Sequence, residues 1–126
     1  MGSSSRPAAL AAAVDVAAVL VFVAIGRTNH DHGVSLGGMA STSWPFLAGL
    51  AVGWVAVRAW RQPLALVPTG LGVWLSCVAV GMVLRVVAGQ GTAVAFIAVA
   101  LAFLALELLG WRLLARVGSR SPAGRR

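Results

Sequence analysis

The feature that most constrains this chain is a series of long apolar segments. The first, residues 8–26, contains nineteen residues and only one charged side chain, Asp15. Because an α-helix rises about 1.5 Å per residue, such a segment approaches the roughly 20 residues that cross about 30 Å of bilayer hydrocarbon. Three further apolar segments follow at residues 44–60, 68–88 and 92–115. The sequence therefore predicts an all-α polytopic membrane protein, a four-transmembrane-helix bundle.

Composition supports the membrane assignment. Apolar residues make up 60% of the chain, against roughly 45–50% in soluble globular proteins. Charged residues make up only 10%, too few to cover a surface that faces water. The net charge of +7 would suggest nucleic-acid binding in a soluble protein, but the arginines stand mostly at the ends of apolar segments. We interpret them as topology signals and as contacts to anionic headgroups.

The arginines also predict the orientation of the bundle, because cytoplasmic loops of membrane proteins carry an excess of Lys and Arg. Eight of the ten arginines fall on one side of the predicted bundle, and only Arg27 and Arg85 fall on the other. We therefore expect a multi-pass protein of the inner (plasma) membrane with both termini cytoplasmic. It would have a short N-terminus at residues 1–7, a membrane domain at residues 8–115 and a basic disordered tail at residues 116–126.

The first apolar segment has a second interpretation, as a cleaved signal peptide. Arg6 precedes the segment, and Ala24-Ile25-Gly26 faintly matches the small-x-small pattern of a cleavage site. Asp15 inside the segment argues against cleavage. We therefore treat the segment as the first helix of the bundle.

Three charged residues lie inside the predicted helices: Asp15, Arg85 and Glu107. Each costs roughly 2.5–3.5 kcal/mol at membrane depth, so such residues usually face protein or water. Asp15 and Glu107 share a depth, roughly 10–12 Å from the cytoplasmic side. If the first and fourth helices are neighbours, the two acids approach each other or the arginines Arg58 and Arg112. They then form either a proton or cation relay or, as we favour, ion pairs that stabilise the helix packing.

A second group of polar residues lies at the opposite, outer end of the predicted bundle. Arg85 shares one helical face with small residues, which suggests that this face packs inward. Arg85 would then lie near Arg27, where two guanidinium groups and Gln90 provide donors that could hold an anion. In the alternative, which we favour, both arginines reach outer headgroups or pair with Asp31.

The polar loop at residues 27–43 carries the triplet His30-Asp31-His32. Two imidazoles two residues apart project to one side of an extended segment and could contribute to a metal site. A solvated loop or a pH-sensitive contact is the better interpretation, because only one carboxylate and no cysteine accompany them. Phosphate-binding loops, metalloprotease motifs and nucleophile elbows are absent from the sequence. We expect no metal, no cofactor and no enzymatic activity.

Glycines indicate where helices pack closely. Gly49 and Gly53 form a small-xxx-small pair in the second helix. We place the start of this helix at Trp44-Pro45, because proline is tolerated in a first turn. Gly81 lies on the inward face of the third helix. The Gly49 and Gly53 face offers a packing surface, from which we expect a homo-oligomer.

An internal duplication is a further hypothesis. The pairs Gly53-Trp54 and Gly110-Trp111 follow Arg27 and Arg85 at offsets of 26 and 25 residues. Matching offsets fit an architecture of two parallel helical hairpins.

Several segments together resemble a known family. In chain order they are Val14-Asp15-Val16, Gly26-Arg27-Thr28-Asn29-His30, Trp44-Pro45-Phe46, Gly53-Trp54, Gly81-Met82-Val83-Leu84-Arg85, Gly89-Gln90-Gly91-Thr92 and Gly110-Trp111-Arg112. This pattern is similar to the small actinobacterial membrane family called domain of unknown function 3054, over about residues 14–114. The resemblance implies a four-helix membrane protein without an assigned activity, and no catalytic residue is carried over from it.

We therefore predict a non-enzymatic structural or accessory component of the membrane. The alternative is a small transporter or channel subunit in which Asp15, Glu107 and Arg85 line a path. An enzyme acting within the lipid is the third hypothesis. The expected partners are the lipid bilayer, anionic headgroups at the arginine-rich tail and a second copy of the chain, and no nucleic acid.

Overall fold

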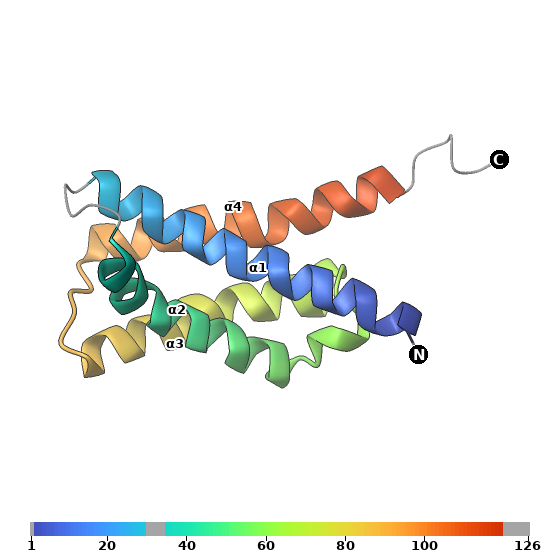
Figure 1. Ribbon diagram of the computed structural model, residues 1–126, viewed down its shortest axis with the longest axis horizontal. Helices are drawn as coiled ribbons and strands as arrows, with labels where there is room; N and C mark the ends of the chain where they lie inside the picture. The colour runs from blue at the N-terminus through green and yellow to red at the C-terminus, as the bar shows by residue number, and fades with distance from the viewer. Residues whose placement is uncertain (1, 30–34, 120–126) are drawn as a thin grey trace.

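The structure, a computed structural model, describes residues 2–29 and 35–119. Within these residues the chain forms four α-helices and two short helical turns. The helices are α1 (Gly2–Asn29), α2 (Leu36–Ala56), α3 (Leu71–Val87) and α4 (Val94–Ser119), and the turns η1 (Ala59–Arg61) and η2 (Leu66–Gly70) connect α2 to α3. Successive helices run in opposite directions, so the start of α1 and the end of α4 lie at the same end of the bundle (Figure 1). The prediction of an all-α fold is confirmed for the described residues.

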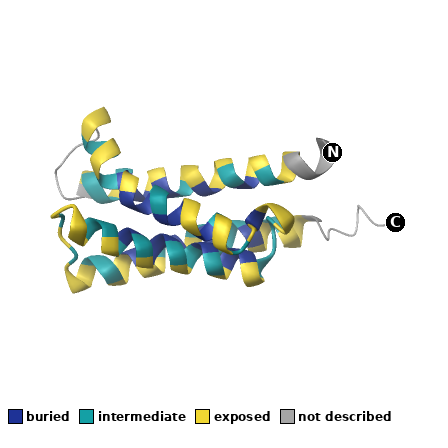
Figure 2. Ribbon diagram, turned by 90° about the horizontal axis from the view of Figure 1, so that it is seen from below, coloured by how far each residue is buried: buried dark blue, intermediate teal, exposed yellow. Residues whose placement is uncertain are grey.

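Apolar side chains cover the outside of the bundle as well as its interior. Figure 2 shows the buried residues along the inner faces of the helices and the exposed ones on the outer faces. Those outer faces carry large apolar residues, such as Val87 at 76% and Leu106 at 73% exposure. Among the described residues, three spans are long and apolar enough to cross a membrane: Arg6–Thr28, Leu66–Val87 and Val94–Gly118. This distribution suits a bilayer and not water.

All four phenylalanines of the chain form one aromatic cluster in the core. Phe22 of α1 contacts Phe46 of α2 edge-on, with the ring centroids 5.5 Å apart, and Phe103 of α4 at 5.6 Å. Phe96 contacts Phe46 at 6.1 Å. Gly81 of α3 leaves room for the Phe46 ring, because a Cβ there would lie 2.8 Å from Phe46 Cδ1. The cluster therefore brings all four helices together.

Helices α2 and α3 pack most closely, and two glycines allow this. A Cβ at Gly49 would lie 2.8 Å from the carbonyl oxygens of both Ser76 and Cys77. A Cβ at Gly53 would lie 2.8 Å from the Ser76 Cβ. The close approach also lets Ser76 Oγ donate a 2.8 Å hydrogen bond to the Gly49 carbonyl. The Gly49 and Gly53 face thus packs against α3 of the same chain, and the homo-oligomer stays a prediction.

Helix α2 begins earlier than predicted, at Leu36 instead of Trp44. Ser35 is its N-cap, with Ser35 Oγ accepting a 3.0 Å hydrogen bond from the Gly38 N–H. Pro45, which we placed in the first turn, lies inside the helix. The prediction was wrong because it used the proline as the start signal, whereas the serine cap upstream satisfies the first N–H groups of the helix.

Pro45 has a consequence for the turn between α3 and α4. Proline has no N–H, so the carbonyl of Ser41, four residues earlier, lacks its usual helical donor. Gln90 lies in the α3–α4 turn and donates its Nε2 to this carbonyl oxygen at 3.0 Å. Pro45 therefore leaves the Ser41 carbonyl available to accept the hydrogen bond that attaches the α3–α4 turn to α2.

Helices α1 and α4 are longer than the apolar segments that predicted them. Helix α1 starts at Gly2, within the predicted N-terminus at residues 1–7, and α4 continues to Ser119, into the predicted disordered tail at residues 116–126. Their 28 and 26 residues correspond to about 42 and 39 Å, more than the roughly 30 Å of hydrocarbon. The ends of a spanning helix can thus extend into the headgroup region. The length of the apolar segment alone therefore underestimates the length of the helix. Residues 120–126 lie outside the described part of the chain.

Candidate functional site

The carboxylate of Asp15, in the middle of α1, accepts four hydrogen bonds. Its side chain is fully buried. Asp15 Oδ1 accepts hydrogen bonds from Trp111 Nε1 and Arg112 Nη1, and Oδ2 accepts from Trp54 Nε1 and Arg112 Nη2, all at 2.8 Å. The four donors come from α2 and α4. One carboxylate therefore connects three helices.

Arg112 is buried as completely as its partner. Its Nη1 donates to Asp15 Oδ1 and its Nη2 donates to Asp15 Oδ2, the bidentate geometry that makes such pairs strong. Arg112 Nε donates to the carbonyl of Pro63 at 2.8 Å, and Nη1 also donates to the carbonyl of Leu108 at 3.0 Å. Four of the five N–H groups of a guanidinium thus have acceptors. The Pro63 contact adds the α2–α3 connection to the three helices already joined.

The position of Arg112 follows from the pattern of α4. Ala100, Leu104 and Leu108 are fully buried and stand four residues apart, and Arg112 is the next residue in this series. Residues at this spacing share one helical face, so the apolar residues that pack α4 into the core also direct the Arg112 side chain inward. We refer to Asp15, Trp54, Trp111 and Arg112 as the buried ion-pair cluster.

Breaking such a cluster is costly although forming it gains little. Two charges lose their hydration on burial, and the pair is tolerated only if hydrogen bonds satisfy the remaining lone pairs and protons. The two tryptophan N–H groups and the two backbone carbonyls supply these bonds here. The cluster is electrically neutral as a whole and joins α1, α2 and α4 through hydrogen bonds.

Glu107 does not join the cluster. Its Oε1 is buried and has no hydrogen-bond partner within the part of the chain that the structure describes. Asp15 instead forms an ion pair with Arg112, which was one of the partners that the sequence allowed. A second bond from Arg112 and one bond from each tryptophan complete the four hydrogen bonds to its carboxylate. The two acids thus differ: Asp15 is satisfied within the chain, and Glu107 holds one orphaned oxygen.

The outer end of the bundle holds a second set of contacts, centred on Arg85. Arg85 Nε donates to the Gly91 carbonyl at 2.8 Å, and Nη1 donates to Gln90 Oε1 at 2.9 Å. Its guanidinium carbon also lies 4.4 Å from the centre of the Phe96 ring. The structure thus places Arg85 beside Gln90, as the sequence predicted. Their polar atoms are hydrogen-bonded to each other and to the turn between α3 and α4. An anion would have to displace these bonds.

Arg27 approaches the same end from α1. Its Nη1 donates to Thr42 Oγ1 at 2.9 Å, next to the Ser41 carbonyl that binds Gln90. The triplet His30-Asp31-His32 lies outside the described residues. Within residues 2–29 and 35–119, no group of three or more His, Cys, Asp or Glu side chains is placed to hold a metal ion.

Sequence reasoning did not include three members of the cluster among the candidate functional residues: Trp54, Trp111 and Arg112. We counted Arg112 as a topology signal, because it stands near the end of an apolar segment, and named it as one possible partner of Asp15. The recurrence of Gly53-Trp54 and Gly110-Trp111 was the available signal, since the two tryptophans donate to opposite oxygens of Asp15. The duplication itself stays a prediction.

Comparison with known families gives one match. The family model described as "Protein of unknown function (DUF3054)" matches residues 12–115. The chain belongs to this family. The match includes all four residues of the buried ion-pair cluster, so the cluster lies within the DUF3054 region of the chain. Neither the comparison with curated proteins nor the comparison with solved structures gave a match.

Proposed function

We propose that this DUF3054 chain is a four-span protein of the inner (plasma) membrane that acts as a non-enzymatic structural or accessory component. The observation that carries the proposal is that the polar groups of the buried ion-pair cluster are hydrogen-bonded within the chain. Asp15 and Arg112 are fully buried, and their polar atoms are bonded to each other and to the chain. A catalytic or transporting group must meet a substrate or ion, whereas the bonds that these two groups make within the described residues go to the chain itself.

The fourth span would be α2, which has a polar first half. Its 21 residues correspond to about 31 Å, enough to cross the hydrocarbon. The hydroxyls in that half are hydrogen-bonded: Ser43 Oγ donates to Met39 O at 2.6 Å, and Thr42 Oγ1 accepts from Arg27. Polar groups paired in this way are tolerated in lipid. The antiparallel order of the helices supports four spans with both termini on the same side.

Cysteine labelling in intact cells would test this topology. Leu36 is 89% exposed and lies beside, not at, the Ser35 cap, so Leu36→Cys should not disturb α2. In a Cys77→Ala background, we expect a membrane-impermeant maleimide to label Leu36→Cys from outside. Arg61→Cys at the opposite end should be labelled only after the cells are opened. The reverse pattern would contradict cytoplasmic termini, and outside labelling of both sites would contradict the fourth span.

Ion flux in proteoliposomes would test the non-transporting part of this role. A structural component should give the same proton and potassium flux as liposomes without protein, under an imposed pH gradient or membrane potential. The matched control is liposomes that contain a pore-forming peptide, which shows that the assay detects flux. Protein-dependent flux above the background of empty liposomes would contradict the proposal.

A small transporter or channel subunit is the second candidate, and one observation favours it. Glu107 Oε1 is buried without a partner among the described residues, and an unsatisfied polar group of this kind costs about 1–3 kcal/mol. A costly group is more readily explained if it binds a proton or cation. Asp15 and Arg85, which the sequence also placed on a path, have partners within the chain.

Replacing Glu107 with leucine separates the two candidates. If Glu107 has no ionic role, Glu107→Leu should raise the free energy of unfolding by about 1–3 kcal/mol, because it removes the orphaned oxygen. Chemical unfolding in detergent micelles, followed by circular dichroism, would measure this change. Glu107→Gln keeps the shape of the side chain and serves as the control. If wild-type protein conducts protons and Glu107→Gln does not, the transporter candidate replaces the structural one.

A further inference from the structure

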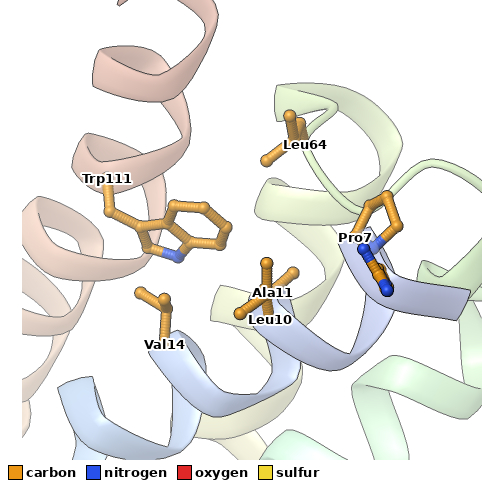
Figure 3. Close-up of a pocket in the computed structure, with 7 residues that line it drawn as sticks. Pro7, Leu10, Ala11, Val14, Leu64 and Trp111 are labelled. Carbon is orange, nitrogen blue, oxygen red and sulfur yellow. The ribbon is translucent and has the colours of Figure 1, made fainter. Parts of the chain in front are cut away.

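A groove opens on the outside of the bundle between α1 and α4, next to the buried ion-pair cluster. Its volume is about 670 Å³. Figure 3 shows the Trp111 ring on one side and the α1 side chains on the other, with Leu64 of the α2–α3 connection nearby. We call it the α1–α4 groove; its lining residues are Arg6, Pro7, Leu10, Ala11, Val14, Leu64 and Trp111.

We propose that the α1–α4 groove binds one anionic phospholipid, with the lipid phosphate on Arg6 and an acyl chain along Leu10, Val14 and the Trp111 ring. The lining is apolar apart from Arg6 and the Trp111 N–H, and that N–H already donates to Asp15. In a bilayer an apolar groove of this kind faces hydrocarbon and not water. The occupant is therefore a lipid chain, and the arginine selects its headgroup.

The depths of Arg6, Leu10 and Val14 in the membrane match the order of headgroup and acyl chain in a phospholipid. Arg6 is the first residue of the candidate span Arg6–Thr28 and so lies at the headgroup level. Leu10 and Val14 follow at four and eight residues, which corresponds to about 6 and 12 Å deeper into the hydrocarbon. A phosphate on Arg6 thus places the acyl chain of the same lipid beside these two side chains.

Charge selects an anionic lipid over a zwitterionic one. The Arg6 side chain is exposed, and among the described residues it has no hydrogen-bond or ion-pair partner. Guanidinium groups bind phosphate oxygens in pairs. The α2–α3 connection, which carries Arg58 and Arg61, lies at the same end of the bundle as the start of α1 (Figure 1), and these arginines add to the positive potential there. A lipid with net negative charge is favoured by this potential, and one without net charge is not.

A second groove provides a comparison within the same molecule. It has a volume of about 630 Å³ and is lined by Leu and Val side chains, small residues and no charged group, including Leu66, Ala105, Leu106 and Gly110. Acyl chains should fill this groove without regard to headgroup. It therefore serves as the matched control for the α1–α4 groove.

Native mass spectrometry of the full chain in detergent would test the proposal, with dioleoyl phosphatidylglycerol and dioleoyl phosphatidylcholine as probes. We expect wild-type protein to retain one phosphatidylglycerol with about fivefold higher affinity than phosphatidylcholine, from one arginine at the membrane surface. Arg6→Gln should remove this preference. Val14→Phe, which fills the groove, should abolish retention of either lipid there. Gly110→Leu fills the second groove, where a Cβ meets nothing within 4 Å, and should leave the preference unchanged.

Three outcomes would overturn the proposal. They are equal retention of the two lipids by wild-type protein, an unchanged preference in Arg6→Gln, and a loss in Gly110→Leu as large as that in Val14→Phe. If Val14→Phe does not fold, as judged by circular dichroism, Leu10→Phe tests the same groove at a position that is 68% exposed. Retention of phosphatidylglycerol by a folded Leu10→Phe at the wild-type level would then count against the groove.

Discussion

Replacing Arg112 with glutamine is expected to lower the free energy of unfolding by about 3–5 kcal/mol, because it leaves the Asp15 carboxylate buried without a counter-charge. The carboxylate would keep only its two tryptophan donors. The α2–α3 connection would also lose its bond from Arg112 Nε to the Pro63 carbonyl. Reversible unfolding in mixed detergent micelles, followed by circular dichroism, would measure the change.

Three further variants define this effect. Arg61 is an exposed arginine at the same end of the bundle, and Arg61→Gln should change the free energy of unfolding by less than about 0.5 kcal/mol. Asp15→Asn should cost as much as Arg112→Gln, and the double variant should cost clearly less than the sum of the two, since both remove one interaction. Equal losses in Arg112→Gln and Arg61→Gln would show that the ion pair does not stabilise the fold.

Replacing Gly49 with valine is expected to destabilise the protein by about 3 kcal/mol, at the upper end of the usual cost of overpacking. The new Cβ would lie 2.8 Å from two backbone oxygens of α3, those of Ser76 and Cys77. Backbone atoms in a helix cannot move singly, so α2 and α3 would have to separate. Thermal and chemical unfolding in detergent would show the loss.

Gly37 provides the matched control, because it lies in the same helix and a Cβ there meets nothing within 4 Å. Gly37→Val should leave the free energy of unfolding unchanged or raise it by a few tenths of a kcal/mol, since valine is a better helix former than glycine. If Gly49→Val were as stable as Gly37→Val, the close approach of α2 to α3 would be refuted.

Some features of the fold were predictable because they depend on local sequence. The membrane assignment follows from the number of consecutive apolar residues, and the all-α class follows because a spanning segment must satisfy its own backbone hydrogen bonds. Asp15 was selected as a candidate because a charge inside an apolar segment is costly wherever the helix turns out to pack. The start of α2 was also encoded locally, in the Ser35 cap, but Pro45 obscured it.

Other features depended on how the helices are rotated about their axes. The sequence offered Asp15 several partners at a similar depth, including Glu107, Arg58 and Arg112, and depth alone does not distinguish them. Arg112 faces Asp15 because it continues the buried series that ends at Leu108, while Glu107 keeps an oxygen without a partner among the described residues. The rotation of α4 that decides this choice is set by packing across the core.

The sequence by itself therefore determined that the chain is helical, with helices long and apolar enough to span a membrane, and that Asp15 needs a partner. Only the tertiary structure decided that this partner is Arg112, with Trp54 and Trp111 completing the shell. It also decided that Gly49 and Gly53 pack against α3 of the same chain. The reason is physical: length and charge act along one helix, whereas hydrogen bonds and close contacts need the relative rotation and spacing of several helices.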